Sequence, residues 1–153
     1  MNVRLWRKVL KMRKNKYLYQ TKRDVRKGCC FPISIINYCL YNKIKVVKLR
    51  HLIKNTNIVK NGGASQKEEW ECLKKVKEVK WKPTYELQKV INNGILSMWH
   101  PDYGLHSVFC YKKDGRYYLI NSLLGGVKRT MKLNEIMKYI PQKERHWYGD
   151  YNR

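Results

Sequence analysis

The 153-residue sequence contains no run of 18 apolar residues, so it offers no candidate for a membrane-spanning helix. Its first residues also lack the uninterrupted apolar segment of a secretory signal. The five cysteines are odd in number and show no paired CxxC spacing, which argues against a disulfide framework and against a structural zinc site. We therefore expect a protein of a reducing intracellular compartment, cytoplasmic or otherwise, with no metal and no cofactor.

Acidic residues are scarce, above all in the first part of the chain. Only 11 Asp and Glu stand against 34 Lys and Arg, for a net charge of +23. Residues 1–60 hold 17 of the basic side chains and a single acid, Asp24. Such a field attracts nucleic acid or another polyanion, and we predict residues 1–60 as the surface that would bind one. The alternative is a solvated lysine-rich surface that reflects an AT-biased genome, viral or thermophilic.

The remaining composition is that of a folded protein, with 43% hydrophobic residues and 12 tyrosines. We expect one compact domain over residues 17–153. Apolar side chains at helical spacing among arginines and lysines predict a basic amphipathic helix over residues 3–16, so we treat residues 1–16 as an extension. The sequence says nothing about the oligomeric state.

Three helices are expected in the first two thirds of the chain. Residues 33–41 are apolar on most sides, and Pro32 suits a first helical turn, so this helix would be buried with its N-terminus at Cys30. Ser65 stands three residues before Glu68, a capping-box spacing that predicts a helix through Val79. A third helix is predicted from Thr84 to Asn93, with Gly94 as its stop.

The pattern then changes to that of β-strands, at residues 95–99, 105–111 and 116–123. Asp114-Gly115 between the last two predicts a hairpin with a type I′ turn. If Lys113 faces Arg116, then His106 faces Leu123 and Asn121 faces Val108. His106 and Asn121 would then be diagonal neighbours on one inward, apolar face.

A histidine beside an asparagine on an apolar face fits two interpretations. Asn121 could accept a hydrogen bond from one ring nitrogen of His106 and leave the other nitrogen aimed at a thiol. The alternative is a buried histidine that its asparagine neighbour merely satisfies. A cysteine early in the chain, at a helix start, followed much later by histidine and asparagine, is the chain order of one class of thiol enzymes.

On these residues the chain resembles the papain-like cysteine peptidases, and among them the compact branch that includes the bacteriocin-processing (double-glycine) peptidases. The motifs are Cys30-Phe31-Pro32-Ile33-Ser34, His106-Ser107-Val108-Phe109 and Tyr118-Leu119-Ile120-Asn121-Ser122, and the resemblance covers about residues 17–125. It implies an α+β fold in which N-terminal helices pack on a C-terminal antiparallel sheet. It also implies Cys30, His106 and Asn121 as the catalytic residues. Phe31 replaces the usual glycine, while Pro32 favours Cys30 over Cys29 as the nucleophile.

The sequence departs from this family at the oxyanion hole. Such enzymes place a glutamine about six residues before the cysteine, where this chain has Asp24, and an ionised acid cannot donate a hydrogen bond. Gln20, ten residues before Cys30, is the substitute candidate. An exposed polar residue is the alternative for Gln20.

Three functions follow from these features. The first is a cysteine peptidase or amidase that acts on peptides or proteins through a thioester, with hydrolysis preferred to acyl transfer. The second is a basic nucleic-acid-binding protein, and the third is a catalytically inactive interaction module.

The other chemistry-bearing residues are expected to be structural. The histidines predicted at the surface are His51, His100 and His146. The tryptophans predicted in the core or on a cleft wall are Trp70, Trp81, Trp99 and Trp147. The cysteines predicted to be inert on apolar faces are Cys39, Cys72 and Cys110. A metal site formed by His100, Asp102 and His106 would be an irregular motif, and we do not predict one.

Overall fold

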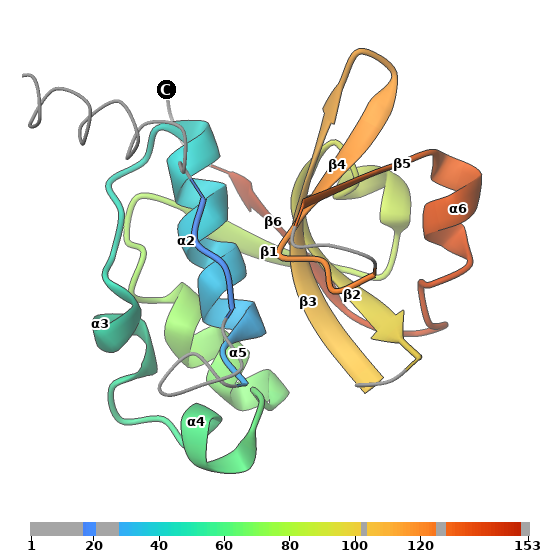
Figure 1. Ribbon diagram of the computed structural model, residues 1–153. Helices are drawn as coiled ribbons and strands as arrows, with labels where there is room; N and C mark the ends of the chain where they lie inside the picture. Colours follow the sequence, from blue (N-terminus) through green and yellow to red (C-terminus); the bar gives the residue numbers. More distant parts are fainter. Residues whose placement is uncertain (1–16, 21–27, 102–103, 125–127, 151–153) are drawn as a thin grey trace, which may run out of the picture.

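The computed structural model describes residues 17–20, 28–101, 104–124 and 128–150 (Figure 1). The predicted helix over residues 3–16, and also Asp24 and Asp102, lie outside the described residues. The helices of the first half are α2 (Cys30–Asn42), α3 (Leu49–Ile53), α4 (Ile58–Asn61) and α5 (Gln66–Leu73). The second half contains β1 (Lys80–Thr84), the 3₁₀ helix η2 (Leu87–Lys89), β2 (Asn93–His100), β3 (Gly104–Lys113), β4 (Arg116–Ile120), β5 (Lys128–Met131), α6 (Leu133–Met137) and β6 (His146–Asp150).

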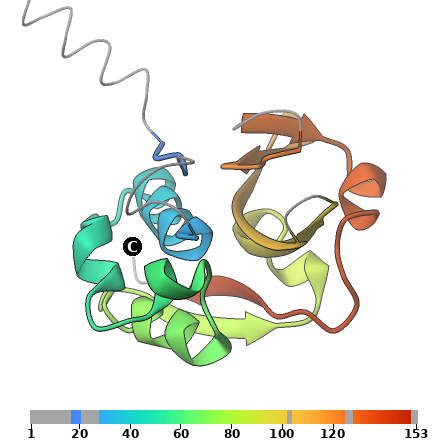
Figure 2. The same ribbon diagram turned by 60° about the horizontal axis from the view of Figure 1, so that its bottom comes forward.

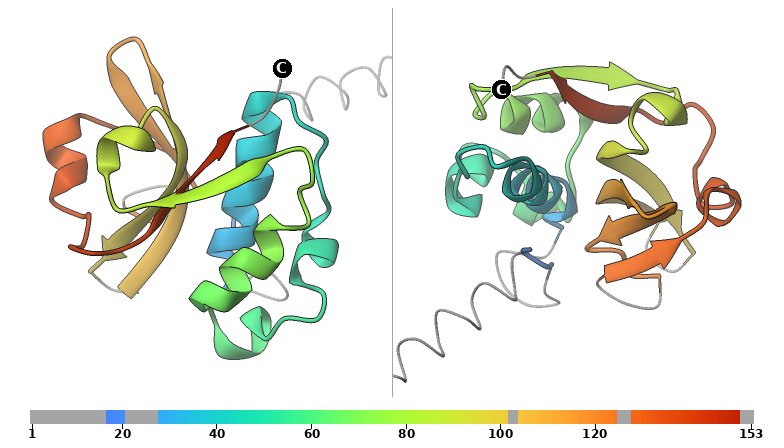
Figure 3. Two further views of the ribbon diagram at one scale, coloured as in Figure 1. Left: turned by 180° about the vertical axis from the view of Figure 1, so that it is seen from behind. Right: turned by 90° about the horizontal axis from the view of Figure 1, so that it is seen from above.

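The strands form one six-stranded antiparallel sheet in the order β1-β6-β2-β3-β4-β5. Helix α2 packs against β2 and β3, and α3, α4 and α5 surround α2 on the same side of the molecule (Figures 1 and 2). Seen from behind and from above, α2 to α5 lie on one side of the molecule and β4, β5 and α6 lie on the other, with β1 and β6 extending toward the helices (Figure 3). The predicted arrangement of helices on an antiparallel sheet is thus confirmed.

Helix α2 is the centre of the core, as its apolar sequence predicts. Ten of its 13 residues are buried, Phe31 and Tyr38 among them, so the helix has no polar face to turn to solvent. It ends at Lys43, whose left-handed backbone (φ 56°) lets its N–H donate to the Cys39 carbonyl. Because the helix begins at Cys30, it places that residue at its N-terminus, as predicted.

The β3–β4 hairpin has the predicted turn and register. Asp114 and Gly115 both have positive φ (52° and 76°), as a type I′ turn requires, and Lys113 pairs with Arg116. The ladder ends where Phe109 meets Ile120, three residues earlier than the predicted strand over residues 116–123. Asn121 is the reason, because its left-handed backbone (φ 69°) turns the chain out of the strand.

Two predicted helices differ from the structure. The capping box of Ser65 and Glu68 is present, but α5 ends at Leu73 and does not reach Val79. The segment predicted as a helix from Thr84 to Asn93 contains only η2. The strand β1 before it was not predicted, because it pairs with β6 more than 60 residues later and its Pro83 is tolerated only on an edge strand.

The predictions for the remaining histidines and tryptophans are corrected in part. His100 and His146 are buried, not at the surface. The His146 Nδ1 accepts the Ser97 N–H at 3.0 Å, and burial lowers the pKa of His146 to about 4, so the ring is neutral and joins β6 to β2. Trp70 and Trp99 are 44% and 53% exposed, which contradicts their expected place in the core or on a cleft wall.

The cysteines expected to be inert, Cys39, Cys72 and Cys110, are fully buried as predicted. Burial raises the pKa of Cys39 and of Cys72 to about 12. Within the described ranges, no helix has the length and apolar character that crossing a bilayer requires. The same residues contain no group of three or more His, Cys, Asp or Glu placed to hold a metal ion.

Candidate active site

The two adjacent cysteines have opposite environments. Cys29, the N-cap residue of α2, is fully buried in the core beneath the helix, whereas the Cys30 side chain is partly exposed and lines a cleft. Cys30 is the first residue of the helix, where backbone N–H groups lack intrahelical partners and the helix dipole favours negative charge. The structure therefore gives Cys30, and not Cys29, access to a ligand.

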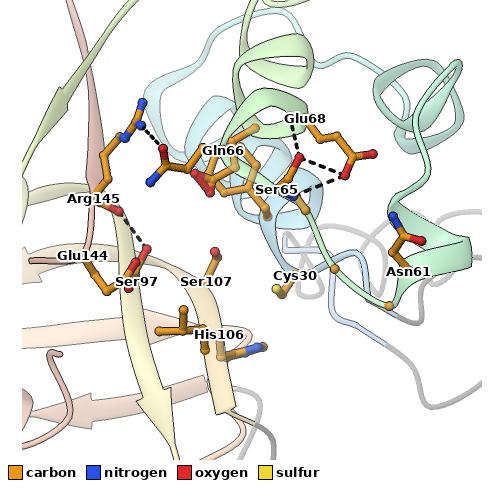
Figure 4. A pocket seen from close by; sticks show the side chains of 16 residues that line it. Cys30, Asn61, Ser65, Gln66, Glu68, Ser97, His106, Ser107, Glu144 and Arg145 are labelled. Carbon is orange, nitrogen blue, oxygen red and sulfur yellow. Dashed lines mark hydrogen bonds between the residues drawn. The ribbon is translucent and has the colours of Figure 1, made fainter.

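The cleft lies between the helices and the sheet and has a volume of about 570 Å³ (Figure 4). One wall comes from residues 61–66 with Glu68 and Glu69, and the other comes from β2 and β3 together with the segment before β6. The side chains that face the cleft from the second wall are Ser97, Leu105, His106, Ser107, Glu144 and Arg145. Cys30 lies between these two walls, with His106 across from it (Figure 4).

A close backbone approach fixes the helical wall beside the thiol. Gly28 has φ 75°, and a Cβ placed on it would lie 2.5 Å from the carbonyl carbon of Gly62. Only glycine fits here, so the turn before Cys30 packs directly on the Gly62-Gly63 backbone that lines the cleft. The glycine pair therefore forms part of a wall of the site.

His106 is 7% exposed, and its Nε2 lies 2.7 Å from the backbone carbonyl oxygen of Asn121. Since a carbonyl can only accept, Nε2 carries the proton and Nδ1 keeps its lone pair. Burial lowers the pKa of His106, and the hydrogen bond to Asn121 partly opposes this effect. The ring is therefore neutral at pH 7, with Nδ1 available as a base.

The Cys30 thiol is also neutral in this arrangement. Burial is the largest influence and raises its pKa, while hydrogen bonds from the Ser107 backbone and hydroxyl and from the Phe31 backbone lower it. The charge of Glu69 adds to the increase. The site thus contains a thiol and a neutral imidazole rather than a preformed ion pair, so a base must remove the thiol proton during any reaction.

Asn121 is fully buried, and its carboxamide binds Gln20 and not, as predicted, His106. Its Oδ1 accepts the backbone N–H of Gln20 at 2.7 Å, whereas its backbone carbonyl binds His106. The left-handed conformation of Asn121, which asparagine adopts more readily than most residues, turns that carbonyl toward the imidazole. The structure brings His106 and Asn121 together as the hairpin register suggested, but through the main chain.

Gln20 lies beside Asn121, not in the cleft. Its backbone makes the bond to Asn121, and its side-chain Oε1 is buried with no hydrogen-bond partner among the described residues. The Nδ2 of Asn121 is buried and unpaired within the same described part of the chain. A role for the Gln20 side chain as an oxyanion donor stays a prediction, and the catalytic roles of Cys30, His106 and Asn121 also remain predictions.

A strap of four residues, 17–20, crosses α2 and places Gln20 beside Asn121. Asn37, in the middle of α2 and fully buried, holds it from both sides: its Oδ1 accepts the Leu18 N–H at 2.8 Å and its Nδ2 donates to the Leu18 carbonyl at 2.9 Å. The ring of Tyr17 packs against Phe109 with centroids 6.3 Å apart. The side-chain amide of Asn37 thus makes the same pair of hydrogen bonds to the Leu18 backbone that a neighbouring β-strand would make.

Sequence reasoning missed three residues of this site: Asn37, Ser107 and Glu69. The signal for Asn37 was a single amide within the apolar run of α2, a buried polar group that needs partners. Strand alternation put Ser107 on the face opposite His106, yet both residues line the cleft. Nothing in the sequence around Glu69 indicates that it would face the thiol.

Helices packed on an antiparallel sheet, with a cysteine at the N-terminus of the central helix and a histidine near the start of a strand, define the papain-like cysteine peptidase fold. This is the predicted fold class. Among solved structures, the chain is similar to the peptidase domain of Streptococcus ComA, described as a bi-functional ABC transporter involved in a quorum sensing pathway. The TM-score is 0.64, and the match covers 90% of this chain and 99% of that domain.

The two sequences are 10% identical, so the likeness shows the fold alone. No protein-family model matches the sequence, and neither does any curated protein. The fold expected from the short motifs is confirmed, and the activity must be argued from the site.

Proposed function

We propose that this protein is a cysteine peptidase or amidase of the papain-like type that cleaves peptides or proteins. The observation that carries the proposal is the pairing of Cys30 with His106 across one cleft, with the Nε2 proton of His106 held by Asn121. This arrangement leaves Nδ1 as the free base and a helix N-terminus beneath the thiol. The shared fold with a peptidase domain supports it, and we extend the resemblance to the bacteriocin-processing branch.

The reaction begins when Nδ1 of His106 takes the proton of the Cys30 thiol. The thiolate attacks the carbonyl carbon of the substrate amide, and the backbone N–H of Cys30 stabilises the oxyanion. The side chain of Gln20, the predicted second donor, would have to turn from its place beside Asn121 into the cleft to take part. The imidazolium then donates its proton to the leaving amine as the C–N bond breaks, which leaves a thioester on Cys30. Water, deprotonated by His106, hydrolyses the thioester and restores the thiol.

Selective alkylation tests the proposal. Cys30 alone among the five cysteines is not fully buried, so iodoacetamide should modify it first, as read by peptide mass spectrometry on a time course. Cys30→Ala should abolish turnover of peptide substrates, whereas Cys29→Ala, its matched neighbour, should retain it. Equal modification of all five thiols would reject a reactive Cys30. Selective modification without turnover would instead indicate the inactive interaction module.

A second candidate function is the binding of nucleic acid, favoured by one surface. Residues 43–67 contain no acid, and the exposed cations between 43 and 60 are Lys43, Lys45, Lys48, Arg50, Lys54 and Lys60. Three of these, with His51, line a hollow of about 580 Å³ beside α3. Exposed cations in a segment without acidic residues can bind the phosphate backbone of a nucleic acid, and this binding releases counterions.

The expected result is binding of single-stranded RNA that weakens steeply with salt and is unchanged in Cys30→Ala. Replacing these six cations with glutamine should reduce the salt slope by about 0.7 for each lost phosphate contact. The matched control neutralises six exposed cations elsewhere, namely Lys112, Lys113, Arg116, Lys128, Lys132 and Lys138. Equal loss in both variants, measured by fluorescence anisotropy, would contradict a specific surface.

A further inference from the structure

The cleft has the opposite charge from the rest of the protein. The net charge of the chain is +23, yet the described residues that line the cleft include three carboxylates, Glu68, Glu69 and Glu144, and one cation, Arg145. The Glu68 carboxylate already has partners, because it accepts the backbone N–H of Ser65 at the start of α5 and that of Asn57 at the start of α4. Glu69 and Glu144 are the acids left to meet a ligand.

Glu69 is a partly buried carboxylate without a cation beside it. Its Oε1 accepts the indole N–H of Trp147 at 3.3 Å, and no ion pair within the described residues joins Glu69 or Glu144 to a basic side chain. Burial raises the pKa of Glu69 to about 7. A carboxylate that has lost much of its hydration gains most from a cation brought by a ligand.

Arg145, which lines the cleft with Glu69, interacts with other residues. Its Nη2 donates to Gln66 Oε1 at 2.6 Å, and its guanidinium lies 5.2 Å from the centre of the Trp147 ring (Figure 4). It lowers the pKa of Glu69 through space but does not pair with it. No other cation among the residues that the structure describes lines the cleft, so Glu69 can pair with a positive group from outside the chain.

Glu69 lines the same cleft as Cys30, and its charge raises the pKa of the Cys30 thiol. A cation placed between the two would offset this effect and favour the thiolate. The contact that binds the ligand's cation would then also make the Cys30 thiol more reactive.

We propose that the cleft binds peptides with a lysine or arginine side chain next to the reacting carbonyl, and that Glu69, with Glu144, pairs with that cation. The statement about cleavage rests on the proposed function. The statement about charge selection at Cys30 does not, since it requires only that the thiol can be reached from the cleft.

Charged thiol reagents test the selection directly in the full-length protein. Trimethylammonioethyl methanethiosulfonate and sulfonatoethyl methanethiosulfonate each transfer a thioalkyl group to the Cys30 thiolate, which forms a mixed disulfide and releases methanesulfinate. Their rates at pH 8, where Glu69 is ionised, are divided by their rates with a small free thiol. We expect the corrected ratio of cationic to anionic reagent to exceed 1, although a net charge of +23 by itself would favour the anion.

Glu69→Gln should lower this ratio about 25-fold, because one unit charge at about 4 Å in water changes each of the two rates about fivefold and in opposite directions. Glu71→Gln is the matched control, because it removes the same charge from the outer face of the same helix, where Glu71 pairs with Lys74, and it should leave the ratio unchanged. Glu144→Gln serves as the second variant should Glu69→Gln fail to fold. For substrates, a lysine peptide should be cleaved faster than its acetyl-lysine analogue.

A wild-type ratio of 1 or below would overturn the inference, and so would an equal decrease in Glu71→Gln. Normal charge selection without turnover of any peptide would overturn the proposed peptidase and leave the cation site standing. Failure of both reagents to modify Cys30 would overturn both, because the thiol would then not be accessible from the cleft.

Discussion

His106→Ala is expected to lower peptide turnover about 10²–10⁴-fold while the protein stays folded, because it removes the base for a thiol that does not ionise by itself. Burial raises the pKa of Cys30 and lowers that of His106, so neither group is charged before substrate binds. Without the imidazole, only the small thiolate fraction at neutral pH could react. Steady-state kinetics, with a thermal melt to confirm folding, measures the loss.

The pH profile identifies the role of His106. Because its folded pKa is lowered below 6.5, the ring is an active base at pH 7, and the wild-type rate should decrease only as the pH falls through that lowered pKa. His51→Ala, which removes an exposed histidine of α3, is the control and should leave both rate and profile unchanged. Full activity in His106→Ala would contradict the mechanism.

Asn37→Leu is expected to cost about 2–4 kcal/mol of unfolding free energy and also to impair the reactivity of Cys30. Leucine is close in size to asparagine, so the main change is that the Leu18 N–H and carbonyl lose their partners. The strap would then no longer hold Gln20 against Asn121, and the Asn121 carbonyl would no longer be fixed against His106. Urea unfolding and the pH dependence of Cys30 alkylation are the two measurements.

Asn42→Leu is a matched control on the same helix. Asn42 is 3% exposed and exchanges two side-chain hydrogen bonds with Asn93 on β2, so its loss should also destabilise the protein. It does not touch the strap, and the alkylation profile of Cys30 should therefore be unchanged. If both variants lose stability equally and neither changes the profile, Asn37 is structural only.

The expectations for His106 and for Asn37 concern one connected path of hydrogen bonds. Asn37 holds Leu18, the strap presents Gln20 to the Asn121 side chain, and the Asn121 main chain fixes the tautomer of His106. Each member is buried or partly buried, so an unpaired group anywhere along the path carries a desolvation cost. The candidate base is thereby tied to the helix whose first residue is the candidate nucleophile.

Local patterns predicted the elements on which this path is built. The apolar run after Pro32 predicted α2, Ser65 with Glu68 predicted the start of α5, and Asp114-Gly115 predicted the hairpin with its register. In each case the determining residues lie within a few positions of one another, so sequence spacing is a direct measure of geometry. The strands β1 and β6 were missed because each depends on a partner far along the chain.

The sequence by itself determined the fold class, the order of cysteine, histidine and asparagine, and the start of the helix at Cys30. Only the tertiary structure decided that Cys29 is buried while Cys30 lines the cleft, and that Asn121 binds His106 through its main chain and Gln20 through its side chain. It also decided that Glu69 lines the same cleft as the thiol and raises its pKa. The physical reason is that these contacts join residues 15 to 101 positions apart or depend on which side chains the packed core excludes, and no local pattern records either.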